Sequence, residues 1–164
     1  MKTAIIYASV HHQNTKKIVE VIASVISADV VDITKEKNIS LVNYDVIGFA
    51  SGIYFNTFHK DLVKYLKETN FSKNQRAFLV YTCGLACRDY SKEIREILNQ
   101  KNIPRIDTFC CRGWDTFSFL KIIGGIAKGH PNDNDFKKAR QFALKNLGSI
   151  IQIKEDNETP PFKI

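Results

Sequence analysis

Short apolar runs alternate with amphipathic stretches along most of the chain. The runs are almost continuously apolar, which is typical of parallel strands that are covered on both faces. The stretches between them carry apolar residues at the spacing of one helix face. This order predicts an α/β domain with a doubly wound, mainly parallel sheet and right-handed crossovers. The predicted strands are 2–8, 29–33, 44–50, 77–82 and 106–111, and the predicted helices are 14–27, 57–68, 89–100 and 133–147.

The length of the chain predicts one domain. A chain of 164 residues fits a single domain with its own core, and no internal repeat or linker divides it. We predict one domain over residues 1–150. Residues 151–164 are polar and contain two prolines, so we expect a loosely docked C-terminal tail.

The charge of the chain restricts its partners. The formal net charge is +7, which favours acidic partners and says nothing about the fold. No recognised motif gathers this charge for nucleic acid. No apolar run approaches the roughly 18 residues of a membrane span, and the N-terminus lacks a signal-peptide pattern. We therefore expect no nucleic-acid partner, no membrane span and a cytoplasmic location, in which the four cysteines are reduced thiols.

The first predicted strand ends in an unusually polar turn. Residues 9–15, SVHHQNT, carry hydroxyls, amides and imidazoles directly before a helix N-terminus. In a doubly wound sheet, ligands bind beyond the carboxyl ends of the strands where the strand order reverses. The unpaired N–H groups and positive dipole of a helix N-terminus favour an anion there. A phosphate site is one interpretation, and simple capping of the helix by Asn14 or Thr15 is the other. The turn matches neither GxxxxGK[ST] nor GxGxxG.

Four segments in the right order resemble the flavodoxin-like family. The turn SVHHQNT resembles its phosphate loop, although His11 and His12 stand where the family often has Thr and Gly. The segment GFASGIYFNTFHKDL resembles its first flavin-ring loop, VYTCG resembles its second, and GGIAKGHPN resembles the ending of one subgroup. The resemblance spans about residues 2–148. It implies a five-stranded parallel sheet of order 2-1-3-4-5 that binds flavin mononucleotide (FMN) non-covalently.

The resemblance also implies which residues hold the cofactor. They come from the phosphate loop and the two ring loops: Ser9, Val10, His11, Gln13, Asn14, Thr15, Ser51, Gly52, Ile53, Tyr54, Phe55, Asn56, Thr82, Cys83 and Gly84. No catalytic side chain is predicted, because the flavin itself carries the redox chemistry, and no metal ligand is predicted.

The two ring loops leave alternatives open. Tyr54 or Phe55 can stack on the flavin ring, or both can belong to the core. The resemblance implies that a peptide in this loop reorients with the redox state of the flavin, which needs a residue tolerant of positive φ, either Gly52 or Asn56. Gly84 either allows a close approach to the ring or is an ordinary turn glycine.

The cysteines and the long connection have two interpretations each. Cys83 and Cys87 are spaced C-x₃-C and Cys110 adjoins Cys111, a pattern that favours small packing residues over a metal site. The segment 112–131 is longer than most connections in α/β proteins. It is either a rim beside the flavin that recognises a partner or substrate, with Trp114 and Arg112 exposed, or a packed loop containing a short helix.

Three functions follow from this interpretation. The first is an FMN electron carrier between a flavin or iron–sulfur reductase and an acidic electron-acceptor protein. The second is an FMN-dependent oxidoreductase that acts directly on a small substrate such as a quinone. The third is a binding or regulatory protein that has lost the flavin.

Overall fold

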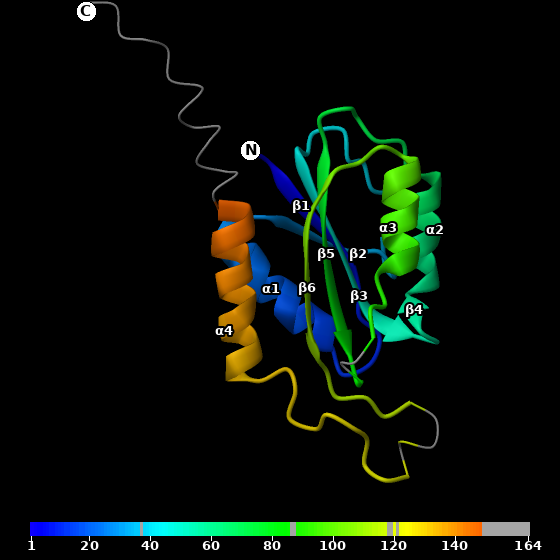
Figure 1. Cartoon of the computed structure of the whole chain (residues 1–164), viewed down its shortest axis with the longest axis vertical. Coiled ribbons are helices and arrows are strands. Elements are labelled where there is room, and N and C mark those ends of the chain that lie inside the picture. Colours follow the sequence, from blue (N-terminus) through cyan, green and yellow to red (C-terminus); the bar gives the residue numbers. More distant parts are fainter. Residues whose placement is uncertain (37, 86–87, 118–119, 121, 149–164) are drawn as a thin grey trace, which may run out of the picture.

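The computed structural model describes residues 1–36, 38–85, 88–117, 120 and 122–148 (Figure 1). Five parallel strands form its sheet in the order β2-β1-β3-β5-β6. Their bounds are Thr3–Ala8 (β1), Asp29–Asp32 (β2), Val46–Tyr54 (β3), Arg76–Cys83 (β5) and Arg105–Arg112 (β6). This order confirms the predicted doubly wound, flavodoxin-like sheet. The predicted tail, 151–164, lies outside the described residues.

Helices cover both faces of the sheet (Figure 1). Helices α1 and α4 lie on one face, and α2 and α3 lie on the other. Their bounds are Asn14–Ile26 (α1), Lys60–Glu68 (α2), Lys92–Gln100 (α3) and Asp133–Phe142 (α4), and α4 continues into a π-helical segment, Ala143–Gly148. None of the helices in the described part of the chain is long and apolar enough to cross a membrane.

The strands divide their side chains between two cores. Ile5 and Val80 pack with α1 and α4, whereas Ile6 and Leu79 pack with α2 and α3. This division follows from the alternation of side chains along a strand. Both cores are apolar, which explains why the strands carry almost continuous apolar runs.

Two predicted helix starts are wrong: α3 begins at Lys92 rather than at residue 89, and α2 begins at Lys60 rather than at residue 57. The segment 57–68 was expected to be helical throughout, but Thr57–Phe58 form a short strand, β4, that pairs antiparallel with the end of β3. Phe55 and Asn56 connect the two strands, and both have positive φ, at 52° and 68°. This two-residue turn extends β3 to Tyr54, beyond its predicted end at residue 50, and delays α2 until Lys60.

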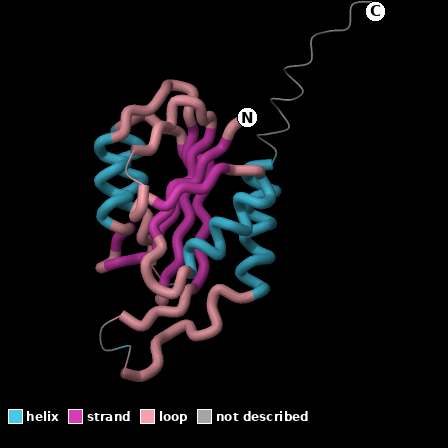
Figure 2. The backbone as a smooth tube through the Cα atoms, turned by 180° about the vertical axis from the view of Figure 1, so that it is seen from behind, coloured by secondary structure: helices cyan, strands magenta, loops and turns pink. Residues whose placement is uncertain are grey.

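The connection between β6 and α4 lies beyond the carboxyl ends of the strands (Figure 2). It folds back on itself, because Asp115 and Ile126 exchange backbone hydrogen bonds of 3.0 and 2.9 Å. The Trp114 N–H donates to the His130 carbonyl at 2.9 Å. The short helix that was one interpretation of this segment falls partly on residues 118, 119 and 121, which lie outside the described residues. The connection thus stands over the edge of the sheet where a ligand is expected.

Candidate functional site

A cavity of about 550 Å³ lies at the carboxyl ends of β1, β3 and β5. Three of its walls are the loops that follow these strands, and the fourth is the connection between β6 and α4. The structure brings most of the predicted site residues to this cavity: Ser9, His11, Asn14, Thr15, Gly52, Ile53, Tyr54, Phe55, Asn56, Thr82, Cys83 and Gly84. The cavity therefore joins segments that are far apart in the sequence.

The loop before α1 is shaped by its backbone conformation and by two side-chain hydrogen bonds. His12 and Gln13 both have φ of 54°, so the chain turns sharply into the helix at Asn14. The Ser9 hydroxyl accepts the Lys16 N–H at 3.3 Å. The Gln13 side-chain amide donates to the Ser9 carbonyl at 3.0 Å. These bonds close the loop around the first turn of α1.

Capping by Asn14 or Thr15 does not explain the polar side chains of this loop. The residue at the cap position is Gln13, whose side chain makes no capping bond. Asn14 instead donates to the Trp114 carbonyl at 2.8 Å, and the Thr15 hydroxyl lies 2.8 Å from that of Thr82. By helix geometry the first N–H groups of α1 have no acceptor within the helix. They and the helix dipole make this end of the cavity favourable for an anion.

Tyr54 connects the first ring loop to the loop before α1. Its hydroxyl accepts the Val10 N–H at 2.9 Å, and its ring contacts the ring of His59 edge-on at 5.2 Å. Burial raises the pKa of the Tyr54 hydroxyl above its ordinary value. The hydroxyl therefore keeps its hydrogen at neutral pH, and no acceptor for that hydrogen is found among the described residues. Tyr54 can donate this hydrogen to an anion in the loop.

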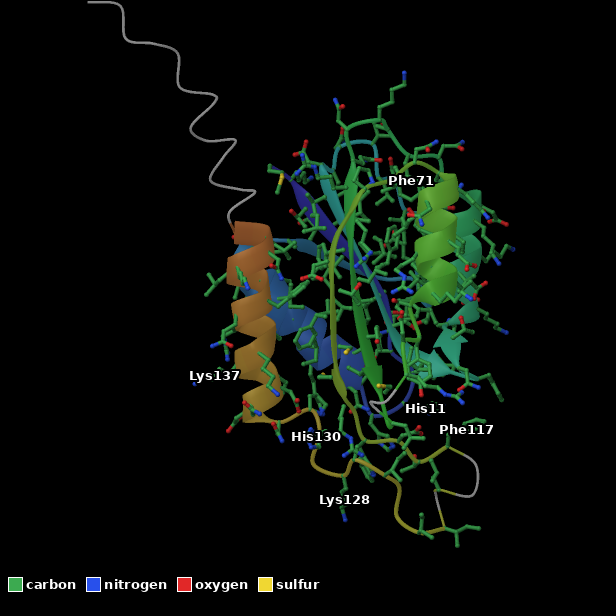
Figure 3. All side chains as sticks on the ribbon, in the orientation of Figure 1. His11, Phe71, Phe117, Lys128, His130 and Lys137 are labelled. Atoms are coloured by element: carbon green, nitrogen blue, oxygen red, sulfur yellow. The ribbon has the colours of Figure 1, made fainter. Side chains whose placement is uncertain are left out.

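Aromatic side chains surround the mouth of the cavity. Phe55 is 82% exposed and meets Phe117 edge-to-face at 5.0 Å between ring centroids. Trp114 also lines the cavity, and the His12 ring stacks on it at 4.0 Å. Figure 3 shows His11 and Phe117 at this end of the molecule. Since neither Tyr54 nor Phe55 is part of the cores, the interpretation that buried both is wrong.

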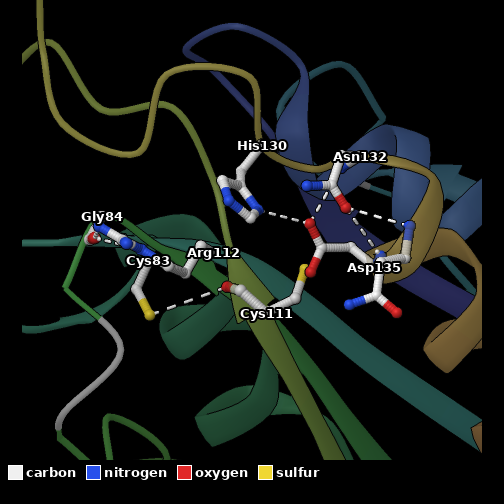
Figure 4. Close-up of polar contacts among 8 residues, drawn as sticks. Cys83, Gly84, Cys111, Arg112, His130, Asn132 and Asp135 are labelled. Carbon is white, nitrogen blue, oxygen red and sulfur yellow. Dashed lines mark hydrogen bonds and ion pairs between the residues drawn. The ribbon is translucent and has the colours of Figure 1, made fainter.

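The second ring loop approaches the connection closely at Gly84. A Cβ atom on Gly84 would lie 2.7 Å from Ile126 and 2.8 Å from the side chain of Asp115. Arg112 donates to the Gly84 carbonyl at 3.1 and 3.3 Å, as Figure 4 shows. A residue larger than glycine at position 84 would therefore collide with the connection between β6 and α4. The close approach of Gly84 is to this connection as well as to the cavity that it lines.

Two expectations for positive φ have different outcomes. Asn56 has φ of 68°, as one of the two candidate residues. Gly52 is not among the glycines with positive φ in the described residues. Phe55, which was not a candidate, has φ of 52°.

Three predicted site residues do not line the cavity: Val10, Gln13 and Ser51. Val10 presents its N–H to Tyr54, and Gln13 holds Ser9. Ser51 is fully buried, and its hydroxyl accepts the His59 N–H at 2.9 Å and donates to the Gly52 carbonyl at 2.6 Å. These residues shape the loops around the cavity.

Several residues of the cavity wall were not predicted: Tyr90, Gly113, Asp115, Leu120 and Ile126. Most of them belong to the connection, in which only Trp114 and Arg112 were singled out as rim residues. Of these two, Trp114 lines the cavity. The length of the connection was the available signal, but no sequence pattern indicated which of its residues face inward. Nothing in the sequence marked Tyr90.

Two of the three described cysteines take part in packing. Cys83 and Cys111 are buried, and the Cys83 thiol donates to the Cys111 carbonyl at 3.9 Å (Figure 4). Burial raises the pKa of the Cys111 thiol. Cys110 is exposed, and Cys87 lies outside the described residues. Among the residues that the structure describes, no three His, Cys, Asp or Glu side chains gather as a metal site requires.

Comparisons with known proteins agree with this geometry. The profile of a family described as a flavodoxin domain matches residues 4–114. An uncharacterized protein of Methanocaldococcus jannaschii is 42% identical over 151 residues, which are 89% of this chain and 100% of that protein.

Solved structures share the fold. The structure is similar to rubredoxin oxygen oxidoreductase of Desulfovibrio gigas, with a TM-score of 0.71 and 12% identity over 94% of this chain and 37% of that one. It is also similar to a flavodoxin of Streptococcus pneumoniae TIGR4, with a TM-score of 0.62 and 15% identity over 92% of this chain and 99% of that one. The chain thus spans only 37% of the length of the Desulfovibrio protein. At these identities the likeness shows the fold alone.

Proposed function

The chain belongs to the flavodoxin domain family, and we propose that it binds FMN in the cavity and carries electrons between two redox partners. One observation carries this proposal. The loops after β1, β3 and β5, which are separate in the sequence, meet around one cavity at the edge of the sheet where doubly wound folds bind ligands.

The residues present fit FMN. The cavity volume of about 550 Å³ lies within the range typical of small-molecule sites. Its polar end adjoins the N-terminus of α1, which suits a phosphate. Its other walls carry apolar and aromatic side chains, as a flavin ring requires, among them Ile53, Phe55 and Trp114. When bound, the flavin supplies the capacity to accept and donate electrons.

The chain itself binds and orients the cofactor. We assign the phosphate to the loop 9–15, where first-turn N–H groups and the Tyr54 hydroxyl donate hydrogen bonds to it. Thr82 and Gly84 border the ring, whose polar edge can bond to backbone groups of that loop. Phe55, Phe117 and Trp114 limit the access of water at the mouth.

The basic character of the chain supports the carrier role. A net charge of +7 favours association with acidic surfaces and makes association rates sensitive to salt. We propose that a flavin or iron–sulfur reductase supplies the electrons and that an acidic protein accepts them. The exposed aromatic pair at the mouth, Phe55 and Phe117, offers a short route to the flavin edge.

A second candidate function is direct oxidation or reduction of a small molecule such as a quinone. The observation that favours it is the wall formed by the connection. Leu120, Ile126 and Tyr90 extend the cavity beyond the residues expected to hold the flavin. That additional apolar space can accept a flat substrate beside the ring.

One pair of assays tests both candidates. The purified protein should carry an acid-extractable yellow chromophore that is identified as FMN. Turnover with a nicotinamide donor and a quinone is then measured with and without an added flavin reductase. A carrier turns over only when the reductase is present, and turnover without it favours the oxidoreductase. A protein that neither carries nor takes up FMN contradicts both.

A further inference from the structure

A second, smaller cavity adjoins the first on the outer side of the loop before α1. Its volume is about 250 Å³, and it shares only Asn14 and Trp114 with the larger cavity. His12 and Lys17 contribute one side, and residues 129–131 of the connection contribute the other. The His12 ring, which stacks on Trp114, therefore faces this cavity rather than the larger one.

The side chains of the second cavity are suited to an anion. Its described lining includes Lys17, His12 and His130, and it includes no Asp or Glu. No ion pair between Lys17 and an acidic side chain is found among the described residues. Three nitrogen-bearing side chains thus line one cavity whose described lining has no carboxylate, and the carboxylate of Asp135 contacts His130 from behind.

The two imidazoles are held in place from behind. The Nδ1 atom of His130 lies 2.6 Å from a carboxylate oxygen of Asp135, which is only 6% exposed and also accepts the Asn132 N–H at 2.9 Å (Figure 4). The Nε2 atom of His12 lies 2.8 Å from the Thr116 hydroxyl. Each ring therefore has one nitrogen bonded to the protein and keeps the other for a ligand. This is the pre-organisation that a binding site needs.

Gly129 lines this cavity in a backbone conformation that favours glycine. Gly129 has φ of 85°, and a Cβ atom placed on it would meet no heavy atom within 4 Å. The Trp114 N–H fixes the adjacent His130 carbonyl at 2.9 Å. Residues 129–131, none of which lines the larger cavity, form the far wall of the second one.

We propose that this cavity, defined by His12, Lys17 and His130, binds a second phosphate group. The inference rests on the proposed function only in that the larger cavity holds the first phosphate. Because Asn14 borders both cavities, two kinds of ligand can supply the second phosphate. It belongs either to a flavin dinucleotide that extends out of the larger cavity or to a separate phosphate-bearing ligand.

The test uses FMN-saturated protein with inorganic phosphate as the probe, and flavin-free protein with FMN and flavin adenine dinucleotide. Binding is followed by calorimetry, and the C–H signals of His12 and His130 are followed by NMR. Lys17→Gln removes the charge in the cavity. Lys16→Gln is the matched control, because Lys16 lies one residue away, pairs with Glu20 at 3.7 Å and does not line this cavity.

Two results support the proposal and identify the source. In the first, phosphate binds the FMN-saturated protein saturably, shifts both histidine signals, and binds about tenfold more weakly to Lys17→Gln but not to Lys16→Gln. In the second, the dinucleotide binds the flavin-free protein about tenfold more tightly than FMN, and Lys17→Gln abolishes this difference. The first result identifies a separate ligand, and the second identifies the dinucleotide.

Two results overturn it. One is the absence of saturable phosphate binding together with equal affinity for the two flavins. The other is an equal loss of binding in the two lysine variants, which reduces the effect to general charge. If the protein binds no flavin, the proposed function fails separately, and phosphate titration of the protein as purified, followed through the same histidine signals, still decides the second site.

Discussion

At the scale of single residues, the site depends on groups that serve two neighbours at once. The Tyr54 hydroxyl accepts a backbone N–H from the loop before α1 and retains a hydrogen for a ligand. The Asn14 amide donates to the connection, although it stands in the first turn of the helix. Such residues set the relative positions of loops that the strands alone do not fix.

Tyr54→Phe tests the hydroxyl. The variant keeps the ring but loses a donor to the phosphate, so FMN affinity should fall at least tenfold, equivalent to about 1.4 kcal/mol. Riboflavin, which has no phosphate, should bind the variant and the wild type within about twofold. Tyr65→Phe is the control, because its hydroxyl bonds to the Ile39 carbonyl away from the cavity. Equal losses for both flavins would assign Tyr54 to the ring instead.

The variant Phe55→Asn tests whether the strained backbone at position 55 contributes to FMN binding at a cost in stability. Phe55 has φ of 52° and is 82% exposed, whereas Asn adopts this conformation at lower cost. We expect the free energy of unfolding to rise by about 0.5–1 kcal/mol in urea titrations and the affinity for FMN to fall. Val42→Asn, at a site that is 76% exposed and without positive φ, should give no such gain. A Phe55 variant that is less stable than the wild type contradicts the argument.

At the scale of elements, the connection between β6 and α4 is fastened to the loop before α1. The closest approach is at Gly113, where a Cβ atom would lie 2.8 Å from the side-chain nitrogen of Asn14. The stacking of His12 on Trp114 adds a second contact between the same segments. Any change in this junction should therefore alter both cavities.

Gly113→Ala tests the junction. The added methyl group forces Asn14 away from Trp114, and overpacking of this kind costs about 1–3 kcal/mol of unfolding free energy. We expect a lower melting temperature and weaker FMN binding. Gly148→Ala is the comparison, because the nearest heavy atom to its added Cβ is 3.8 Å away. Unchanged FMN affinity in Gly113→Ala would separate the connection from the site.

Glu93 in α3 bonds to residues of β4 and α2, and its lowered pKa makes its contribution to stability depend on pH. Its carboxylate accepts from the Thr57 hydroxyl in β4 at 2.7 Å and from Lys67 in α2 at 3.0 Å. The bond from Thr57, and then that from Lys67, lower the pKa of Glu93 in the folded protein. The stabilisation that the Glu93 carboxylate gives to the folded protein is therefore complete above the ordinary glutamate pKa of about 4.3. It is lost as the pH falls through the lower pKa of the folded state.

The Glu93→Gln variant tests this dependence in urea unfolding between pH 7 and pH 3. The wild type should be the more stable at pH 7, and the difference should shrink toward pH 3. Because the side chain is 40% exposed, we expect less than about 1 kcal/mol. Glu96→Gln, on the same helix, controls for the loss of a carboxylate. A difference that stays constant with pH contradicts the assignment.

The same elements show what sequence patterns can predict. The parallel strands and their order followed from apolar runs and from the resemblance, because burial on both faces leaves a strong signal. The turn between β3 and β4 leaves no such signal in the sequence, because Phe-Asn is not a usual pair for two residues of positive φ. The pairing of Asp115 with Ile126 was equally hidden, because it depends on tertiary contacts within a long connection.

At the scale of the whole molecule, an α/β body with two apolar cores presents the loops of the candidate site at one end of its sheet (Figure 2). The predicted site residues were identified mainly through three short motifs, and the fold explains why these motifs meet. The residues of the fourth wall escaped prediction because no motif marks them. The net charge of +7 belongs to this scale as well, since it acts on encounters with partners rather than on the fold.

The central claim is that the cavity at the end of β1, β3 and β5 holds FMN, and calorimetric titration of the flavin-free protein tests it most directly. We predict saturable binding of one FMN per chain. At about 100 times the Kd, FMN should add about 2.7 kcal/mol to the free energy of unfolding. Titration without saturable heat, together with a melting temperature that excess FMN leaves unchanged, would contradict the claim.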